Sequence, residues 1–189
     1  CLDRPTFGSY YLEGIDINEK TDDELSAVRN KKIGFVFQSF NLIPRTSALH
    51  NVELPMIYGK VKAAEREAIA QKLLEQVGLS DRAGHMPNEL SGGQKQRVTI
   101  ARTLMKDPDI LIFDDSTSSV DSETEFEIQK AMRNLMQGKT AFIIAHRITS
   151  IQDCDRIIVL DKGNIIEEGT HEELIGHDGF YKKIYDIQI

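Results

Sequence analysis

Short apolar runs alternate with helical patterns along much of the chain. Residues 33–37 (IGFVF) form a continuous β-rich run, which is typical of a strand buried on both faces. Further apolar runs follow it, and stretches of helical character over about residues 123–136 and 149–153 separate them. This alternation predicts an α/β fold whose parallel sheet carries helices on its faces. The further runs are residues 110–113, 141–145 and 156–160.

The segment from residue 39 to residue 89 has a different texture, with prolines and scattered polar residues, and it predicts a mostly helical insertion. A helix is expected over about residues 63–77, since Ile69, Leu73 and Val77 repeat at the spacing of one helix face. Gly78 suits the end of that helix. We therefore expect three parts: residues 1–38, a helical subdomain at 39–89, and residues 90–189 with a signature helix and α/β core.

The two ends of the chain predict smaller elements. Residues 10–13 read as a short strand, and nothing before them predicts a strand or helix, so the chain is expected to begin inside a domain. Residues 161–164 (DKGN) predict a tight turn into a polar-alternating strand at 165–168. The tail, residues 170–189, is expected to be helical.

Composition narrows the class of protein. With 189 residues and 40% hydrophobic residues the chain is expected to be globular, and it has neither a membrane-length apolar run nor the layout of a signal peptide. The formal net charge of −7 disfavours a nucleic-acid partner, because such domains usually carry a basic face. Cys1 and Cys154 lie far apart and form no metal or disulfide pattern, which fits a reducing cytoplasm.

A glycine pair predicts a phosphate contact. Gly92 and Gly93 directly follow Ser91 and precede an apolar stripe that marks a long helix. Backbone N–H groups at a helix N-terminus lack partners and carry partial positive charge, and glycines let an anion approach them. The usual phosphate loop, G-x-x-x-x-G-K-[ST], does not occur in these 189 residues. Residues 138–140 (GKT) match only its end and precede a strand, so they are read as a solvated turn.

Polar side chains stand where three predicted strands end. Gln38, the pair Asp114 and Asp115, and His146 each follow an apolar run. Carboxylates and a glutamine there can hold Mg²⁺ and orient water, and an imidazole can contact a terminal phosphate. Each also has an ordinary alternative: a loop glutamine, a structural histidine, and a helix cap formed by the two aspartates.

The order and spacing of these motifs resemble the nucleotide-binding domain of an ABC transporter, a P-loop NTPase-like fold. The matching segments are Gln38 (Q-loop), residues 90–94 (LSGGQ, signature), residues 110–114 (Walker B), residues 119–121 (SVD, D-loop) and His146 (switch histidine). The resemblance covers essentially the whole chain.

The resemblance implies a division of roles and a set of partners. It implies ATP and Mg²⁺ as cofactors, a second ABC domain stacked head to tail, and a transmembrane subunit or domain at the cytoplasmic face of a membrane. The nucleotide contacts would come from Ser91, Gly92, Gly93, Gln94 and Asp121. The metal would be held by Asp114 and Gln38, and the catalytic residues would be Asp115, His146 and Gln38.

Three departures from the family pattern matter. The opening strand and Walker A loop have no counterpart, so an N-terminally truncated domain is expected, inactive by itself. Asp115 stands where hydrolytic members usually have glutamate, and its shorter arm is expected to slow the reaction. Residues before about Pro108 resemble macrolide- and lipoprotein-release ATPases, whereas later residues resemble multidrug-exporter domains. A non-catalytic or regulatory ABC domain, and a soluble ABC ATPase of translation or DNA repair, are the alternatives.

Overall fold

The computed structural model describes residues 3–37, 39–114, 128, 132–133 and 136–188. Gln38, Asp115 and Asp121 lie outside the described residues, as does most of the helix predicted over 123–136. The chain divides into two compact units, Cys1–Phe142 and Ile143–Ile189. Each unit is described by itself.

Unit 1 begins with a small hairpin and a helix. Strand β1 (Tyr11–Leu12) pairs antiparallel with β2 (Ile15–Asp16), which confirms the predicted strand, and a short 3-10 turn, Ile17–Glu19, follows. Helix α1 (Asp22–Lys32) was not predicted. Its signal was a capping box, Thr21-x-x-Glu24, in which each side chain accepts a hydrogen bond from the other residue's backbone N–H.

Three strands form a sheet with the order β3-β4-β5. Its strands are β3 (Ile33–Val36), β4 (Ile110–Asp114) and β5 (Thr140–Ile144), which confirms the three predicted strands to within a residue at each end. β3 and β4 run parallel, and Val36 lies opposite Phe113. Both of these side chains are fully buried, so the predicted sheet core is present.

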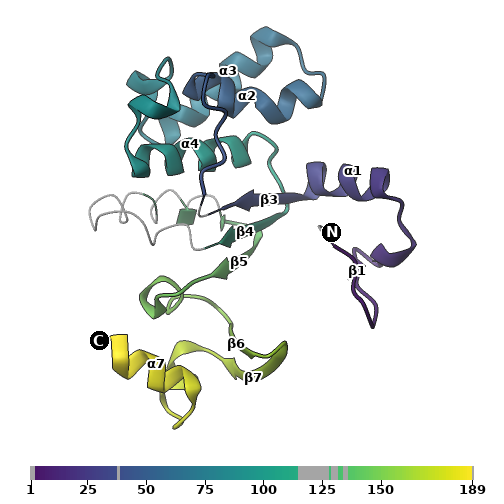
Figure 1. Ribbon diagram of the computed structural model, residues 1–189, viewed down its shortest axis with the longest axis vertical. Helices are drawn as coiled ribbons and strands as arrows, with labels where there is room; N and C mark the ends of the chain where they lie inside the picture. Colours follow the sequence, from purple (N-terminus) through teal and green to yellow (C-terminus); the bar gives the residue numbers. More distant parts are fainter. Residues whose placement is uncertain (1–2, 38, 115–127, 129–131, 134–135, 189) are drawn as a thin grey trace. The chain divides into compact units, whose positions relative to one another are not determined.

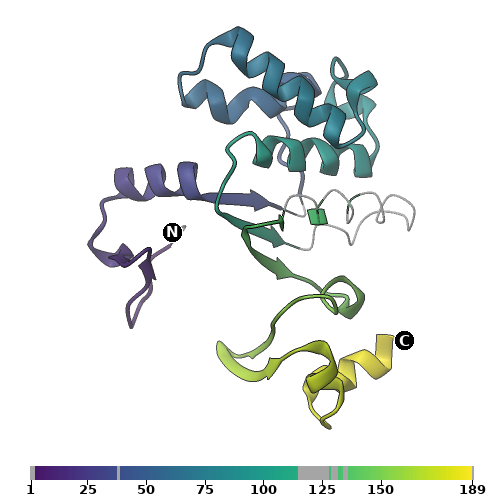
Figure 2. The same cartoon turned by 180° about the vertical axis from the view of Figure 1, so that it is seen from behind.

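Three helices cover this part of unit 1. Helices α2 (Ala48–Tyr58) and α3 (Ala63–Gln76) pack on each other and on α4 (Gly92–Leu104), and α4 also packs on β3. Both views show α4 between the α2–α3 pair and the strands (Figure 1) (Figure 2). Two 3-10 turns, Ser80–Arg82 and Pro87–Glu89, connect α3 to α4.

The predicted apolar stripe of α3 is confirmed at Val77, which is buried at the end of the helix, but not at its two earlier positions. Ala70 and Leu74 are its fully buried residues, whereas Ile69 and Leu73 are only half-buried. The contacts made with α2 and α4 favour the neighbouring face, which a sequence period alone does not fix. Gly78 ends the helix as predicted, with a left-handed φ of +68°.

Unit 2 contains a hairpin and two short helices. The 3-10 turn Ile148–Ser150 precedes β6 (Ile157–Asp161), which pairs antiparallel with β7 (Asn164–Gly169) in a separate two-stranded sheet. The prediction that residues 156–160 join the parallel sheet is therefore wrong for the described residues. The tight turn is confirmed, since Lys162 and Gly163 both have positive φ, which matches the twist of a two-residue hairpin.

The helical tail consists of two helices rather than one. These are α6 (His171–Ile175), which starts at a capping box on Thr170, and α7 (Phe180–Gln188). Leu174 and Tyr181 from these helices pack with Ile148 and Ile157 as the buried core of unit 2.

Candidate functional site

Helix α4 begins at the predicted Ser91, with a capping box at its N-terminus. The Ser91 hydroxyl accepts a hydrogen bond from the Gln94 N–H at 3.3 Å, and the Gln94 side-chain oxygen accepts one from the Ser91 N–H at 3.0 Å. Within the described residues no acceptor engages the N–H of Gly92 or Gly93. Two backbone donors at the positive end of a 13-residue helix therefore have no partner among the described residues; Gly92 is half-buried and Gly93 is buried.

The carboxyl ends of β3 and β4 lie at one edge of the sheet. Because the two strands are parallel and Val36 lies opposite Phe113, Asp114 occupies the position just past this pair, where it is half-buried. Gln38 follows β3 by two residues in sequence and lies outside the described residues. Asp114 is thus the described candidate for a metal ligand, while the metal and catalytic roles of Gln38 and Asp115 stay predictions.

His146 follows β5 by two residues, as predicted, and is exposed in unit 2. Its backbone is held by Gln188: the Gln188 amide donates to the His146 carbonyl at 2.8 Å and accepts from the Ile148 N–H at 2.8 Å. These bonds fix the main chain on both sides of Arg147 and leave the exposed His146 available to a ligand.

Side chains on one face of α4 donate hydrogen bonds to backbone carbonyls around the end of β3. The Thr99 hydroxyl and the Arg102 guanidinium both donate to the Phe40 carbonyl, at 3.0 and 3.1 Å, and Arg102 also donates to the Asn41 carbonyl at 2.7 Å. One turn along the helix, the Thr103 hydroxyl donates to the Phe35 carbonyl at 3.0 Å. The sequence alone did not single out these residues. Their signal was polar side chains at i, i+3 and i+4 beside the apolar stripe.

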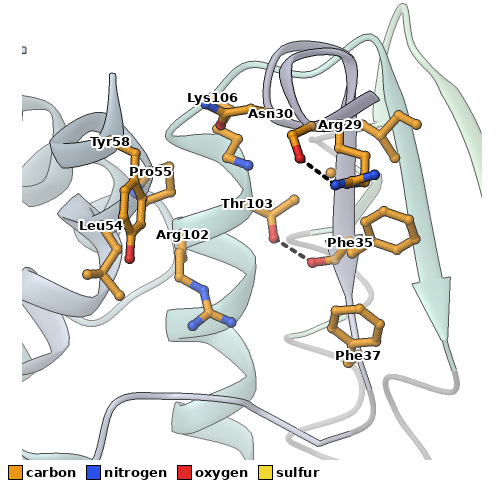
Figure 3. Close-up of a pocket in the computed structure, with 13 residues that line it drawn as sticks. Arg29, Asn30, Phe35, Phe37, Leu54, Pro55, Tyr58, Arg102, Thr103 and Lys106 are labelled. Atoms are coloured by element: carbon orange, nitrogen blue, oxygen red, sulfur yellow. Dashed lines mark hydrogen bonds between the residues drawn. The ribbon is translucent and has the colours of Figure 1, made fainter. Parts of the chain in front are cut away.

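A pocket of about 470 Å³ opens beside this contact (Figure 3). Leu54, Pro55 and Tyr58 of α2 lie on one side of α4 in this view, and Phe35 and Phe37 on the other. We call this pocket the α4 groove. Its full lining is Ser26, Arg29, Asn30, Ile33, Gly34, Phe35, Phe37, Leu54, Pro55, Tyr58, Arg102, Thr103 and Lys106.

The α4 groove is cationic. Arg29, Arg102 and Lys106 line it, and no carboxylate does among the residues that the structure describes. Burial lowers the pKa of Arg102, and burial together with the neighbouring Arg102 charge lowers the pKa of Lys106. An anionic group entering the groove would relieve this crowding of positive charge.

Comparison with known proteins decides the family. The family model for "ABC transporter" matches residues 2–118. The chain belongs to the ABC transporter family. It is 47% identical over 178 residues to the ABC transporter ATP-binding protein YknY of Bacillus subtilis. The aligned region covers 93% of this chain and 77% of YknY. The chain is also 47% identical over 171 residues to the macrolide export ATP-binding/permease protein MacB of Rhodopirellula baltica, covering 88% of this chain and 25% of MacB.

A solved structure agrees with this assignment. The dimeric, post-hydrolysis form of the ATP-binding cassette MJ0796 of Methanocaldococcus jannaschii, bound to ADP and Pi, matches with a TM-score of 0.82 and 43% identity. The match covers 90% of this chain and 76% of that one. The predicted ABC ATPase fold is thereby confirmed, and the chain is an ATP-binding domain of an ATPase family. Among the described residues no helix is both long and apolar enough to cross a membrane.

Proposed function

We propose that this ABC domain hydrolyses MgATP at an interface shared with a second ABC domain and so drives transport by a membrane partner. The observation that carries the proposal is the N-terminus of α4, where the N–H groups of Gly92 and Gly93 have no partner in the described part of the chain and lie beside a capping box that holds Ser91 and Gln94. Such a site binds a phosphate that another group delivers. A nucleotide held by the partner domain supplies that phosphate.

The other residues have roles at the domain's own site. Asp114, at the carboxyl edge of the parallel strands, holds Mg²⁺ together with Gln38. Asp115 orients the attacking water, and His146 contacts the γ-phosphate. Asp121 and Gln94 complete the contacts across the interface. The metal supplies charge neutralisation at the phosphates when it is bound.

We assign contact with the membrane partner to the α4 groove. Its three cations and its aromatic side chains fit an amphipathic segment that carries carboxylates. MacB joins an ATP-binding part to a permease in one protein, as its name states, which supports a membrane partner for this domain. Replacing Lys106 with glutamate should therefore weaken binding of the partner, measured by co-purification, while basal ATPase activity stays within about twofold.

Mixed dimers test the shared site. The 189 residues contain no G-x-x-x-x-G-K-[ST] motif, so they can supply the signature helix to a shared site but no phosphate loop. A second protein, called the loop-bearing form, carries such a motif ahead of Cys1. Its Gly92→Asp variant has a carboxylate at the phosphate site. Neither the 189-residue chain nor this Gly92→Asp variant should hydrolyse ATP alone. Mixed together they should, because one composite site is intact.

Two results would contradict the proposal. One is an absence of phosphate release from the mixture when the loop-bearing form without the substitution is active. The other is full activity of the loop-bearing Gly92→Asp protein by itself. Gly84→Asp is the matched control, since a side chain there meets no atom within 4 Å, and it should leave activity unchanged.

A further inference from the structure

Helix α4 contacts the chain both before and after Gln38. Before it, the Thr103 hydroxyl donates to the Phe35 carbonyl at 3.0 Å. After it, the Phe40 carbonyl accepts from both Thr99 and Arg102. These contacts lie on the helix whose N-terminus carries Gly92 and Gly93, so one rigid element is bonded to both flanks of a residue expected to bind the metal.

The contact by Arg102 is the most specific of these. Its two terminal nitrogens donate to consecutive carbonyls, those of Phe40 and Asn41, at 3.1 and 2.7 Å. Asn41 has a left-handed φ of +46°, a conformation that asparagine adopts more readily than most non-glycine residues. The planar guanidinium holds its donors in a fixed geometry, which a lysine ammonium on its flexible stem does not reproduce.

The same segment is fixed from its far side. Asn51 of α2, which is fully buried, accepts a hydrogen bond from the Ile43 N–H at 2.8 Å and donates to the Ile43 carbonyl at 3.3 Å. The Phe40 ring also lies against α4, with the Lys95 ammonium 6.0 Å from its centre. The residues that follow Gln38 are thus held between α4 and α2.

We propose that Arg102 and Thr99 are positioning residues, which lock the Phe40–Asn41 segment to the signature helix. Through this lock, the carboxyl edge of β3 and β4, where Asp114 lies, and the phosphate site at the α4 N-terminus keep a fixed distance and orientation. This inference rests on the proposed function, because it gives the lock a role in turnover. A displacement of about 1 Å at a reacting centre can lower a rate by about a hundredfold, so a loosened segment should reduce kcat.

A matched pair of substitutions tests it in the loop-bearing form. Arg102→Lys keeps the positive charge and loses the fork. Arg97→Lys makes the same change on the same helix, but the Arg97 guanidinium donates to the Val77 carbonyl at the end of α3, at 3.1 Å. We expect Arg102→Lys to lower kcat by about 10- to 100-fold, with the KM for ATP within about twofold, and Arg97→Lys to leave kcat within about twofold.

A second pair guards against misfolding of the arginine variant. Thr99→Val removes the hydroxyl at nearly constant shape, and Thr99→Ser retains it. Thr99→Val should lower kcat by about 3- to 10-fold, on the basis of one lost hydrogen bond, and Thr99→Ser should restore it. Equal turnover in the valine and serine variants would overturn the role of Thr99.

Hydrogen exchange on the same proteins reports the lock directly. Amide exchange over residues 39–43 should be at least about tenfold faster in Arg102→Lys, while residues 92–95 should exchange as before. Normal kcat or unchanged amide exchange in Arg102→Lys would overturn this inference and leave the proposed function standing. Absence of turnover from the unsubstituted loop-bearing form would overturn the proposed function, and with it the catalytic role given to Arg102.

Discussion

Gly34 of β3 and Thr103 of α4 approach so closely that a Cβ atom on Gly34 would lie 2.6 Å from the Thr103 Cγ2 atom. The same Cβ would lie 2.7 Å from a ring carbon of Pro108. Both neighbours are buried and stiff, so they cannot move aside without displacing backbone. The contact sets how near α4 can lie to β3, and therefore whether Thr103 reaches the Phe35 carbonyl.

We expect Gly34→Ala to lower the free energy of unfolding by about 1–3 kcal/mol, the usual range for an overpacked core. Gly84→Ala is the matched control, because its new methyl group meets no atom within 4 Å. Urea denaturation of both variants measures the difference. Equal stability of the two would contradict the close packing of α4 on β3.

Asn51→Leu should lower the free energy of unfolding by about 2–4 kcal/mol, since it removes several buried hydrogen bonds at once. The Asn51 amide donates to the carbonyls of Ile43, Thr46 and Ser47 and accepts from the Ile43 N–H. Asn51→Asp should also destabilise the fold, because a carboxylate would face these three carbonyls. Chemical denaturation of both variants is the measurement, and a wild-type midpoint in Asn51→Asp would rule out the donor role.

The capping box of α1 should contribute to the stability of the fold in a way that is lost at acidic pH. The Thr21 backbone N–H, the Lys20 ammonium and the Thr21 hydroxyl all bond the Glu24 carboxylate and lower its pKa from 4.5 to about 2. A lowered folded-state pKa means that this stabilisation is complete above pH 4.5 and is lost as the pH falls toward 2. The melting temperature of Glu24→Gln should therefore lie below wild type near neutral pH, and the gap should close toward pH 2. A gap that is independent of pH would contradict this.

His146→Ala in the loop-bearing form should lower turnover far more than nucleotide affinity. His146 is exposed after β5, and its proposed contact is with the terminal phosphate alone. Steady-state kinetics and a nucleotide-binding titration on one sample separate the two effects. An unchanged kcat would remove His146 from the mechanism.

Asp115→Glu in the loop-bearing form should raise kcat by up to about a hundredfold, because the longer side chain regains reach to the attacking water. If Asp115 only caps the segment after β4, the rate should stay constant and the melting temperature should fall slightly. Rate and melting temperature measured together distinguish these outcomes.

Short sequence patterns were sufficient to predict elements whose conformation depends on residues close together in the chain. The apolar runs of β3 and β4 predicted buried strands, and residues 161–164 predicted a tight turn, since each pattern is carried by residues close together in the sequence. The apolar run of β6 did not predict that β6 pairs with β7 in a separate sheet, because the same sequence can suit an antiparallel or a parallel partner.

The sequence by itself determined the family, the order of the motifs and the helix start at Ser91, because these rest on residue identity and spacing along the chain. Only the tertiary structure decided that Arg102 and Thr99 bond carbonyls some 60 residues away, and that the α4 groove gathers three cations from α1, α4 and the turn after α4. Backbone carbonyls look alike in every sequence, so a hydrogen bond to a distant one leaves no mark in the residue pattern. It is set by how helix and sheet pack.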